Sequence, residues 1–290
     1  MNDYAIHLAI LCGIYLILAQ SLNLTFGLGL LFNLAHIAVY AIGAYTTALL
    51  AVNLDQSFWV CVPASMLVSA VFALSIGGIS LKLTHDYFAI GSLAFSAIVT
   101  ALLINWKSLT RGVLGIPGIP RPELFGVDFY ENANFLALIS VFVFFAFVVL
   151  WLVFNSRFAR QLRAQSEHEH AAMALGIGLR EVRNNSFIVS SMFAGLAGSF
   201  FAYYINYIDP SSFGLHEMVF VFSIVIIGKP GSFWGVALAT IFLVLLPEPL
   251  RFIEMSPSIL GPMRQLLYAV ILFAVVYWKR ESLFPVQRTV

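Results

Sequence analysis

The chain has 290 residues, of which 61% are hydrophobic and 10% are charged, and its formal net charge is +1. A soluble domain carries roughly 25% charged residues, so no soluble fold could bury this much apolar surface, and the bilayer must be the solvent. The small net charge gives no indication of a nucleic-acid partner. Both cysteines, Cys12 and Cys61, lie in apolar stretches and are interpreted as small buried hydrophobes rather than a disulfide or metal pair.

The apolar stretches predict an all-α polytopic membrane bundle of about eight transmembrane spans, since one span needs about 20 apolar residues. The N-terminus lacks the basic region and cleavage site of a signal peptide, so we expect the first apolar run to be retained. Residues 4–54 contain no charged side chain and hold two spans, separated by a break at 23–29. The segments expected to span the membrane in this way are 5–23, 28–52, 57–81, 87–106, 134–154, 186–207 and 263–278.

Residues 217–249 are harder to interpret, because a Lys-Pro-Gly sequence interrupts them at 229–231. We expect two short or tilted helices that meet at this turn, and a re-entrant hairpin is the alternative. Prolines exclude a continuous helix from the loop 107–133, and its charges exclude it from lipid. The whole chain, 1–290, is interpreted as one membrane domain without a soluble part.

The polar interval 155–185 lies between two apolar runs and carries five arginines. The positive-inside rule places it and the basic C-terminal tail in the cytoplasm. The N-terminus, the proline-rich loop and Asp209 then lie on the outside. Topology accounts for the arginines but not for the helical sequence at 167–176. Its small apolar face ends at Gly176, a typical helix stop, and such a face on a cytoplasmic helix is typical of a docking surface.

Motifs for covalent chemistry are missing from the sequence. There is no phosphate-binding loop of the P-loop or dinucleotide type, so an ATPase that drives transport would be another polypeptide. His168 and His170 alternate with Glu167 and Glu169, and neighbours at this spacing point away from one another on a helix, which disfavours a metal site. No catalytic serine or zinc motif of a membrane enzyme is present.

The candidate pathway residues lie at the break and at the start of the second span. His36 is the ionisable residue expected deepest in the membrane; it is either a packed core histidine or a gate residue near Asn33 and Tyr40. The break is either a simple turn or a stretch whose backbone lines a route for a polar solute. His216 and Glu217 are interpreted as the solvated start of a helix. The shortage of buried charges disfavours an ion-coupled secondary transporter.

Five sequence stretches resemble the LivM-type permeases of the branched-chain (hydrophobic) amino acid ABC importer family. The cassette 170–176 resembles the coupling loop of ABC importer permeases, with His170 where the family usually has glutamate. A lysine, Lys229, replaces a glycine that the family usually carries. The other stretches are SLNLTFG at 21–27 with His36 and IGAY at 42–45, DYFAIGSLAF at 86–95, LTRG and GIP between 109 and 117, and AGLAG at 194–198 with PSSF at 210–213.

The resemblance implies a permease subunit in the bacterial inner membrane, with loop 155–185 and the C-terminus cytoplasmic. Its implied partners are a second, LivH-like permease, two cytoplasmic ATPase subunits that bind ATP and Mg²⁺, and a periplasmic substrate-binding protein. The chain itself would bind no cofactor. The implied cargo is a branched-chain or hydrophobic amino acid; urea or a short amide is the alternative within the family.

The resemblance and the residues together give two sets of site predictions. Residues predicted to couple the permease to the ATPase are Glu167, Glu169, His170, Ala171, Ala172, Leu175 and Gly176. Residues predicted to line the substrate pathway are Asn23, Thr25, Phe26, Gly27, Asn33, His36 and Tyr40.

Overall fold

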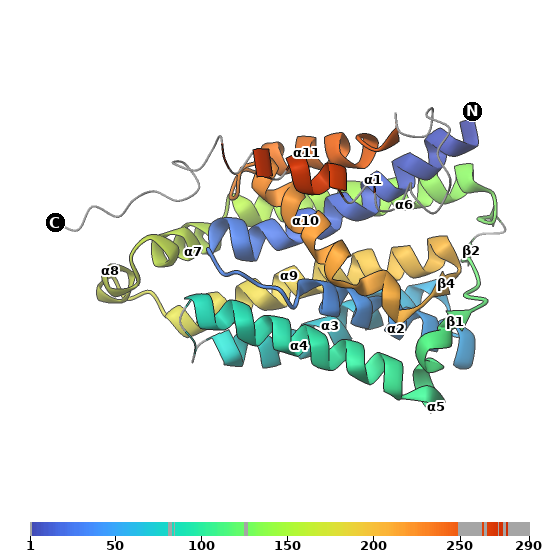
Figure 1. Cartoon of the computed structure of the whole chain (residues 1–290), viewed down its shortest axis with the longest axis horizontal. Helices are drawn as coiled ribbons and strands as arrows, with labels where there is room; N and C mark the ends of the chain where they lie inside the picture. The colour runs from blue at the N-terminus through green and yellow to red at the C-terminus, as the bar shows by residue number, and fades with distance from the viewer. Residues whose placement is uncertain are drawn as a thin grey trace.

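The computed structural model describes residues 2–80, 83, 85–124, 127–248, 263, 266–271, 273–274 and 277. These residues hold seven helices long and apolar enough to cross a membrane, and a shorter apolar helix at Phe233–Leu245. The main helices run along the long axis of the molecule (Figure 1). The all-α polytopic membrane fold is therefore confirmed.

The membrane helices correspond closely to the predicted spans, with two exceptions. The second span begins at His36 instead of residue 28, because a π-helix and a non-helical stretch fill the interval. The sixth begins at Leu179 instead of residue 186, so it takes in the last part of the predicted polar loop. The helices are α1 (Asn2–Leu22), the π-helix η1 (Asn23–Leu28), α2 (His36–Asn53), α3 (Phe58–Ser80), α4 (His85–Asn105), α6 (Asn132–Phe154), α9 (Leu179–Ile205), α10 (Leu215–Ile227) and α11 (Phe233–Leu245).

One end of the bundle, here named the proline-rich end, carries short elements in place of a continuous helix, as the prolines predicted. Strand β1 (Ile116–Pro117) pairs antiparallel with β4 (Tyr207–Ile208), which ties the loop to the end of α9. The remaining elements at this end are α5 (Lys107–Thr110), η2 (Gly112–Leu114), the pair β2 (Glu123–Leu124) and β3 (Val127–Asp128), and η3 (Pro210–Phe213).

The opposite end, named the basic end, carries α7 (Arg157–Glu167) and α8 (Glu169–Ala174). Both helices extend beyond the bundle in Figure 1. Of the predicted last span, 263–278, the described residues are helical, whereas 264–265, 272, 275–276 and 278 lie outside the described residues, as does the C-terminal tail.

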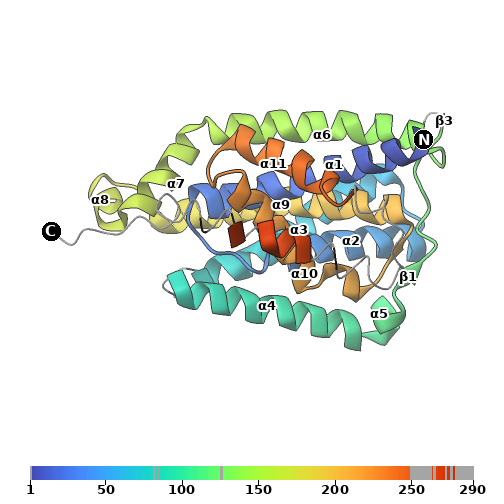
Figure 2. The same cartoon turned by 45° about the horizontal axis from the view of Figure 1, so that its top comes forward.

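Helix α9 is the packing centre of the bundle and lies against α1, α2 and α3. Close approach depends on glycine: a Cβ at Gly43 would lie 2.4 Å from the Cα of Gly195, and one at Gly198 would lie 2.2 Å from the Tyr40 carbonyl oxygen. Small residues at such crossings let membrane helices gain van der Waals contact along their backbones. Figure 2 shows α6 and α4 along opposite edges of this centre.

Helices α10 and α11 confirm the predicted pair of short helices joined by a Gly/Pro turn. The turn lies at the basic end, where the Gly231 N–H meets the side chain of Asn23. Beyond α11, Glu248 accepts a hydrogen bond from Tyr4 near the start of α1. Helix α11 therefore runs from the basic end back towards the proline-rich end. The two cysteines lie apart, Cys12 half-buried in α1 and Cys61 buried in α3.

Gly198→Ala tests the close crossing of α2 and α9. The added methyl group would force the two backbones apart, and we expect a loss of roughly 1–3 kcal/mol of stability. Thermal unfolding of the purified protein, followed by tryptophan fluorescence, should show a lower Tm. Gly78→Ala in α3 is the matched control, because its Cβ would meet nothing within 4 Å. Equal melting temperatures for Gly198→Ala and the parent would contradict this account of the packing.

Candidate functional site

The helix predicted at 167–176 corresponds to α8, Glu169–Ala174, and Glu167 is the last residue of α7. Ser156 caps the start of α7, because its hydroxyl accepts a hydrogen bond from the Ala159 N–H, and the helix ends at Glu167. His168 is extended, with φ −148° and ψ 97°, and α8 follows it. Gly176 adopts φ +79°, in the left-handed region that favours glycine. The chain thus reverses at Gly176 and enters α9, as expected of a helix stop.

The short helix α8 has one buried face and one exposed face. Ala172 is 2% exposed, whereas Met173 and Leu175 are 47% and 80% exposed. Glu169 forms an ion pair with Arg183 of α9, which anchors α8 to the bundle. The predicted apolar face of the cassette is therefore divided: Ala172 packs inward and the other predicted apolar residues point outward. Met173 was not among the predicted coupling residues, although it follows the buried Ala172 and therefore lies on the exposed face of α8.

Helix α7 connects the exposed α8 to the break in the first membrane helix. The Ser166 hydroxyl donates to the carbonyl oxygen of Leu28 at 2.9 Å. Leu162 is buried, and its Cδ1 atom lies 3.2 Å from the position that a Cβ on Gly29 would occupy. Helix α7 therefore contacts the end of η1 through both a hydrogen bond and an apolar side chain.

The break is in turn bonded to the turn between α10 and α11. The Asn23 side chain accepts a hydrogen bond from the Gly231 N–H at 2.8 Å and donates to the Ser232 carbonyl at 3.3 Å. Gln20 donates to the Phe233 carbonyl at 2.7 Å. A Cβ on Gly27 would lie 2.4 Å from the nitrogen of Gly231. Asn23 and Gly27 thus hold two segments together, and Gly27 also lines a hollow beside Gly231 and Ser232.

Three further predicted pathway residues make local contacts. The Thr25 hydroxyl donates to the Leu22 carbonyl at 3.2 Å, and the Asn33 side chain accepts from the Ala35 N–H at 3.1 Å, just before α2. The Phe26 ring packs against Phe32 and Phe222, with centroids 5.1 and 5.0 Å away. These contacts order the non-helical stretch that precedes α2.

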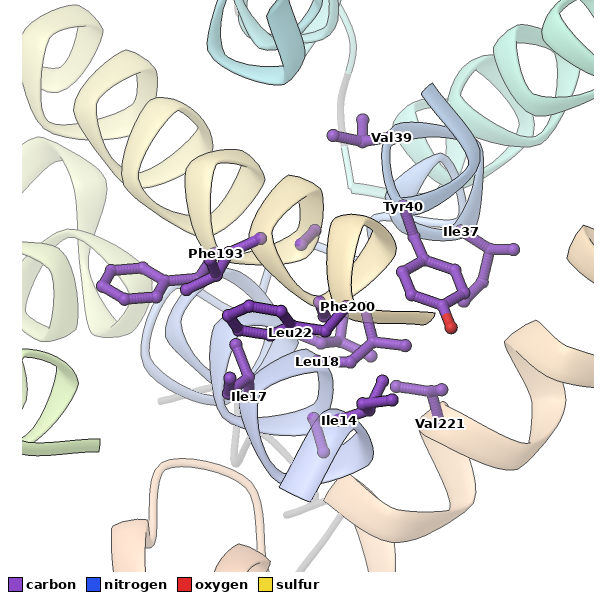
Figure 3. Packing of buried hydrophobic residues seen from close by; sticks show 14 of the residues in the cluster. Ile14, Ile17, Leu18, Leu22, Ile37, Val39, Tyr40, Phe193, Phe200 and Val221 are labelled. Carbon is purple, nitrogen blue, oxygen red and sulfur yellow. The ribbon is translucent and has the colours of Figure 1, made fainter. Parts of the chain in front are cut away.

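His36 and Tyr40 are the predicted pathway residues that lie deepest. His36 is fully buried, and its Nε2 lies 3.1 Å from the Ser21 hydroxyl and 3.2 Å from the Leu18 carbonyl oxygen. It therefore joins the start of α2 to α1. The buried Tyr40 hydroxyl has no hydrogen-bond partner among the described residues. Figure 3 shows this hydroxyl directed towards the helix that carries Val221, which is α10.

Glu217 was interpreted from the sequence as the solvated start of a helix, and the structure differs. It is the third residue of α10, but its carboxylate is half-buried against α1, where the Tyr15 hydroxyl donates to Oε1 at 2.6 Å. Tyr15 is the central residue of the continuous helical stretch from Asn2 to Leu28. The signal that could have revealed it is a carboxylate inside the apolar stretch 210–227.

The proline-rich end has a hollow of about 520 Å³ lined by Asp55, Gln56, Trp59, Arg121 and other residues. The Arg121 guanidinium lies over the rings of Phe135 and Tyr204, 5.1 and 5.6 Å from their centroids. It also donates to the Tyr130 carbonyl at 2.8 Å. These contacts hold the positively charged Arg121 side chain at the proline-rich end.

Asp209 lies at the same end, as predicted, next to the strand pair. Partial burial opposes its ionisation, but the hydroxyls of Ser211 and Ser212 and the Ser212 N–H donate to the carboxylate. These hydrogen bonds outweigh the burial and hold the pKa of Asp209 below its usual value. Asp209 therefore stays ionised where the chain turns from α9 towards α10.

The fold and these contacts define a helical membrane permease. The chain matches the family described as "Branched-chain amino acid transport system / permease component" over residues 4–276. It is 36% identical to the high-affinity branched-chain amino acid transport system permease protein LivM of Escherichia coli, over 98% of this chain and 70% of that protein. The chain belongs to this family of permease components.

The names of more distant relatives give two kinds of cargo, branched-chain amino acids and guanosine. The LivH permease of Salmonella typhimurium is 25% identical over 79% of both chains. A guanosine ABC transporter permease of Bacillus subtilis, NupQ, is 26% identical over 59% of this chain and 58% of that protein. No solved structure matches the chain.

Asn23→Ala tests the bond between the break and the α10–α11 turn. It removes both side-chain hydrogen bonds to the turn and leaves part-buried backbone groups unsatisfied, which costs about 1–3 kcal/mol per group. We expect hydrogen–deuterium exchange of the amides at 228–232 to become faster. Asn105→Ala is the control, because the exposed Asn105 side chain bonds only within α4, to the Ala101 carbonyl. Unchanged exchange at the turn in Asn23→Ala would refute this role.

Proposed function

We propose that this chain is a permease subunit of an ATP-driven importer that moves branched-chain or hydrophobic amino acids across the bacterial inner membrane. The observation that carries the proposal is α8, a short helix anchored by Ala172 and the Glu169–Arg183 ion pair that exposes His170, Met173 and Leu175. The sequence carries no nucleotide-binding motif, so the energy would come from two separate ATPase subunits that bind ATP and Mg²⁺.

The basic end faces the cytoplasm in this proposal, because five arginines between 155 and 185 follow the positive-inside rule. The C-terminal tail lies on the same side. The proline-rich end then faces the periplasm, where its hollow at Arg121 would receive a substrate-binding protein. A second permease of the same family would complete the membrane domain.

The proposed mechanism follows a chain of contacts. Closure of the ATPase pair would push α8, and α7 would carry the motion to η1 through the Ser166–Leu28 hydrogen bond. Asn23 would pass it to the α10–α11 turn through Gly231. ATP binding can change the side to which the permease opens only if these contacts differ in free energy between the inward-open and outward-open states.

The amino-acid cargo is favoured by the extent of the similarity. The branched-chain relative from Escherichia coli aligns with 98% of this chain, whereas the guanosine relative aligns with 59%. Uptake of labelled leucine, guanosine and urea by the reconstituted system separates these cargoes. Uptake that persists without ATP and follows an ion gradient would instead identify a secondary transporter.

Leu175→Asp tests α8 as the ATPase docking surface. Leu175 is 80% exposed, so an added charge should leave the fold intact but oppose burial against a partner. We expect ATPase subunits to co-purify poorly and ATP-dependent leucine uptake to fall at least about tenfold, which equals about 1.4 kcal/mol.

Leu114→Asp is the matched control, since Leu114 is 81% exposed at the opposite end of the bundle. It should leave ATPase co-purification unchanged. If Leu175→Asp retains both ATPase binding and uptake, α8 does not couple the permease to an ATPase.

A further inference from the structure

A carboxylate lies near the middle of the membrane helices, at Glu217. Its partner Tyr15 is about 20 Å along the helix from either Asn2 or Leu28, at 1.5 Å per residue. The other described acidic residues of the membrane helices, such as Asp3 and Glu181, lie in first turns at the ends of the bundle. Glu217 also lies in the first turn of a half-length helix, because η3 and the extended Gly214 interrupt the segment before it.

Polar and aromatic groups surround this carboxylate. The Tyr15 hydroxyl donates to it, and the Tyr15 ring meets Phe220 edge-on with centroids 5.1 Å apart. Tyr40, on α2, lies within electrostatic reach of Glu217, and its buried hydroxyl has no partner among the described residues. The ion pair among the described residues is that of Arg183 with Glu169. No described lysine or arginine therefore pairs with Glu217.

The chemistry of this site suits a small organic cation. A carboxylate within a membrane bundle is costly unless it is paired, and it commonly marks a substrate or ion route. One carboxylate can accept about four hydrogen bonds and an ammonium group donates three, so Tyr15 leaves capacity for a ligand. Aromatic rings attract cations at their faces. Glu217 lies in the first turn of α10, where the helix dipole favours the ionised carboxylate that the cation would meet.

We propose that Glu217, with Tyr15 and Tyr40, forms a subsite for the α-ammonium group of the transported amino acid. This inference rests on the proposed function and names the chemical group that the permease itself recognises. The carboxylate accepts the ammonium, Tyr15 fixes the carboxylate, and the Tyr40 hydroxyl provides a further acceptor. Urea and simple amides carry no cationic group, so the subsite would favour amino acids over them.

Glu217→Gln tests the subsite. The glutamine has the same shape and still accepts the Tyr15 hydrogen bond, so the fold should survive while the charge is lost. In the full complex with its ATPases and binding protein, we expect leucine uptake to fall at least about tenfold. ATP hydrolysis stimulated by the loaded binding protein should stay close to the parent value, because the coupling contacts are untouched.

Two variants separate recognition from structure. Glu248→Gln alters another tyrosine–glutamate pair between α1 and the α10–α11 hairpin, away from the membrane centre, and should leave uptake unchanged. Tyr15→Phe keeps the charge and should lower uptake less than Glu217→Gln.

The outcomes distinguish this inference from the proposed function. If the parent complex transports no amino acid, the proposed function fails and the inference falls with it. If the parent transports leucine and Glu217→Gln transports it equally well, the inference alone fails. Parallel loss of uptake and of stimulated ATP hydrolysis in Glu217→Gln would show a structural role and would also overturn it.

Discussion

The interruption of the first membrane helix is the constraint on which the structure depends. Backbone groups that leave the α-helical pattern inside a bilayer must find partners within the protein. Asn23 and Gln20 supply those partners to the α10–α11 turn, and Ser166 binds the Leu28 carbonyl. Backbone groups of the turn and of the end of η1 are therefore satisfied by contacts among the turn, the first helix and α7. This dependence joins three segments far apart in the sequence.

Close packing at glycines of α2 and α9 supports the first membrane helix. The crossing of α2 and α9 at Gly43, Gly195 and Gly198 leaves no room for a side chain. It holds the start of α2 against α1, where His36 bonds to the Leu18 carbonyl. The bundle is thus tight around α9 and α2, whereas the basic end consists of short helices joined by a few polar contacts.

The sequence was sufficient to predict the fold class and most of the spans, because lipid demands long apolar stretches wherever a helix crosses. It also located the turn at 229–231, but the break predicted at 23–29 lies later: residues 23–28 continue the first helix as η1, and the non-helical stretch is 29–35. It could not place the start of α2, since residues 28–35 are as apolar as a span and only their tertiary contacts prevent a helix. The helix predicted at 167–176 is shorter in the structure, because it begins after the extended His168 and ends at Ala174.

The functional residues were harder to predict for a related reason. Asn23 and Gly27 were recognised as unusual, but their partners at 231–232 lie some two hundred residues away and have no local signal. Glu217 was mistaken for a solvated helix start, because its depth is set by Tyr15 on α1 and not by its own neighbours in the sequence.

The π-helical form of η1 carries one residue more per hydrogen-bonded turn than an α-helix. Each residue of an α-helix turns the chain by about 100°. If η1 became α-helical, Gly27 and Leu28 would swing around the axis by about that angle. The Leu28 carbonyl would then leave Ser166, and Gly27 would turn away from Gly231. A change between the π-helical and α-helical forms would therefore rotate the C-terminal end of the first membrane helix about its axis. The N-terminal part, α1, would keep its position.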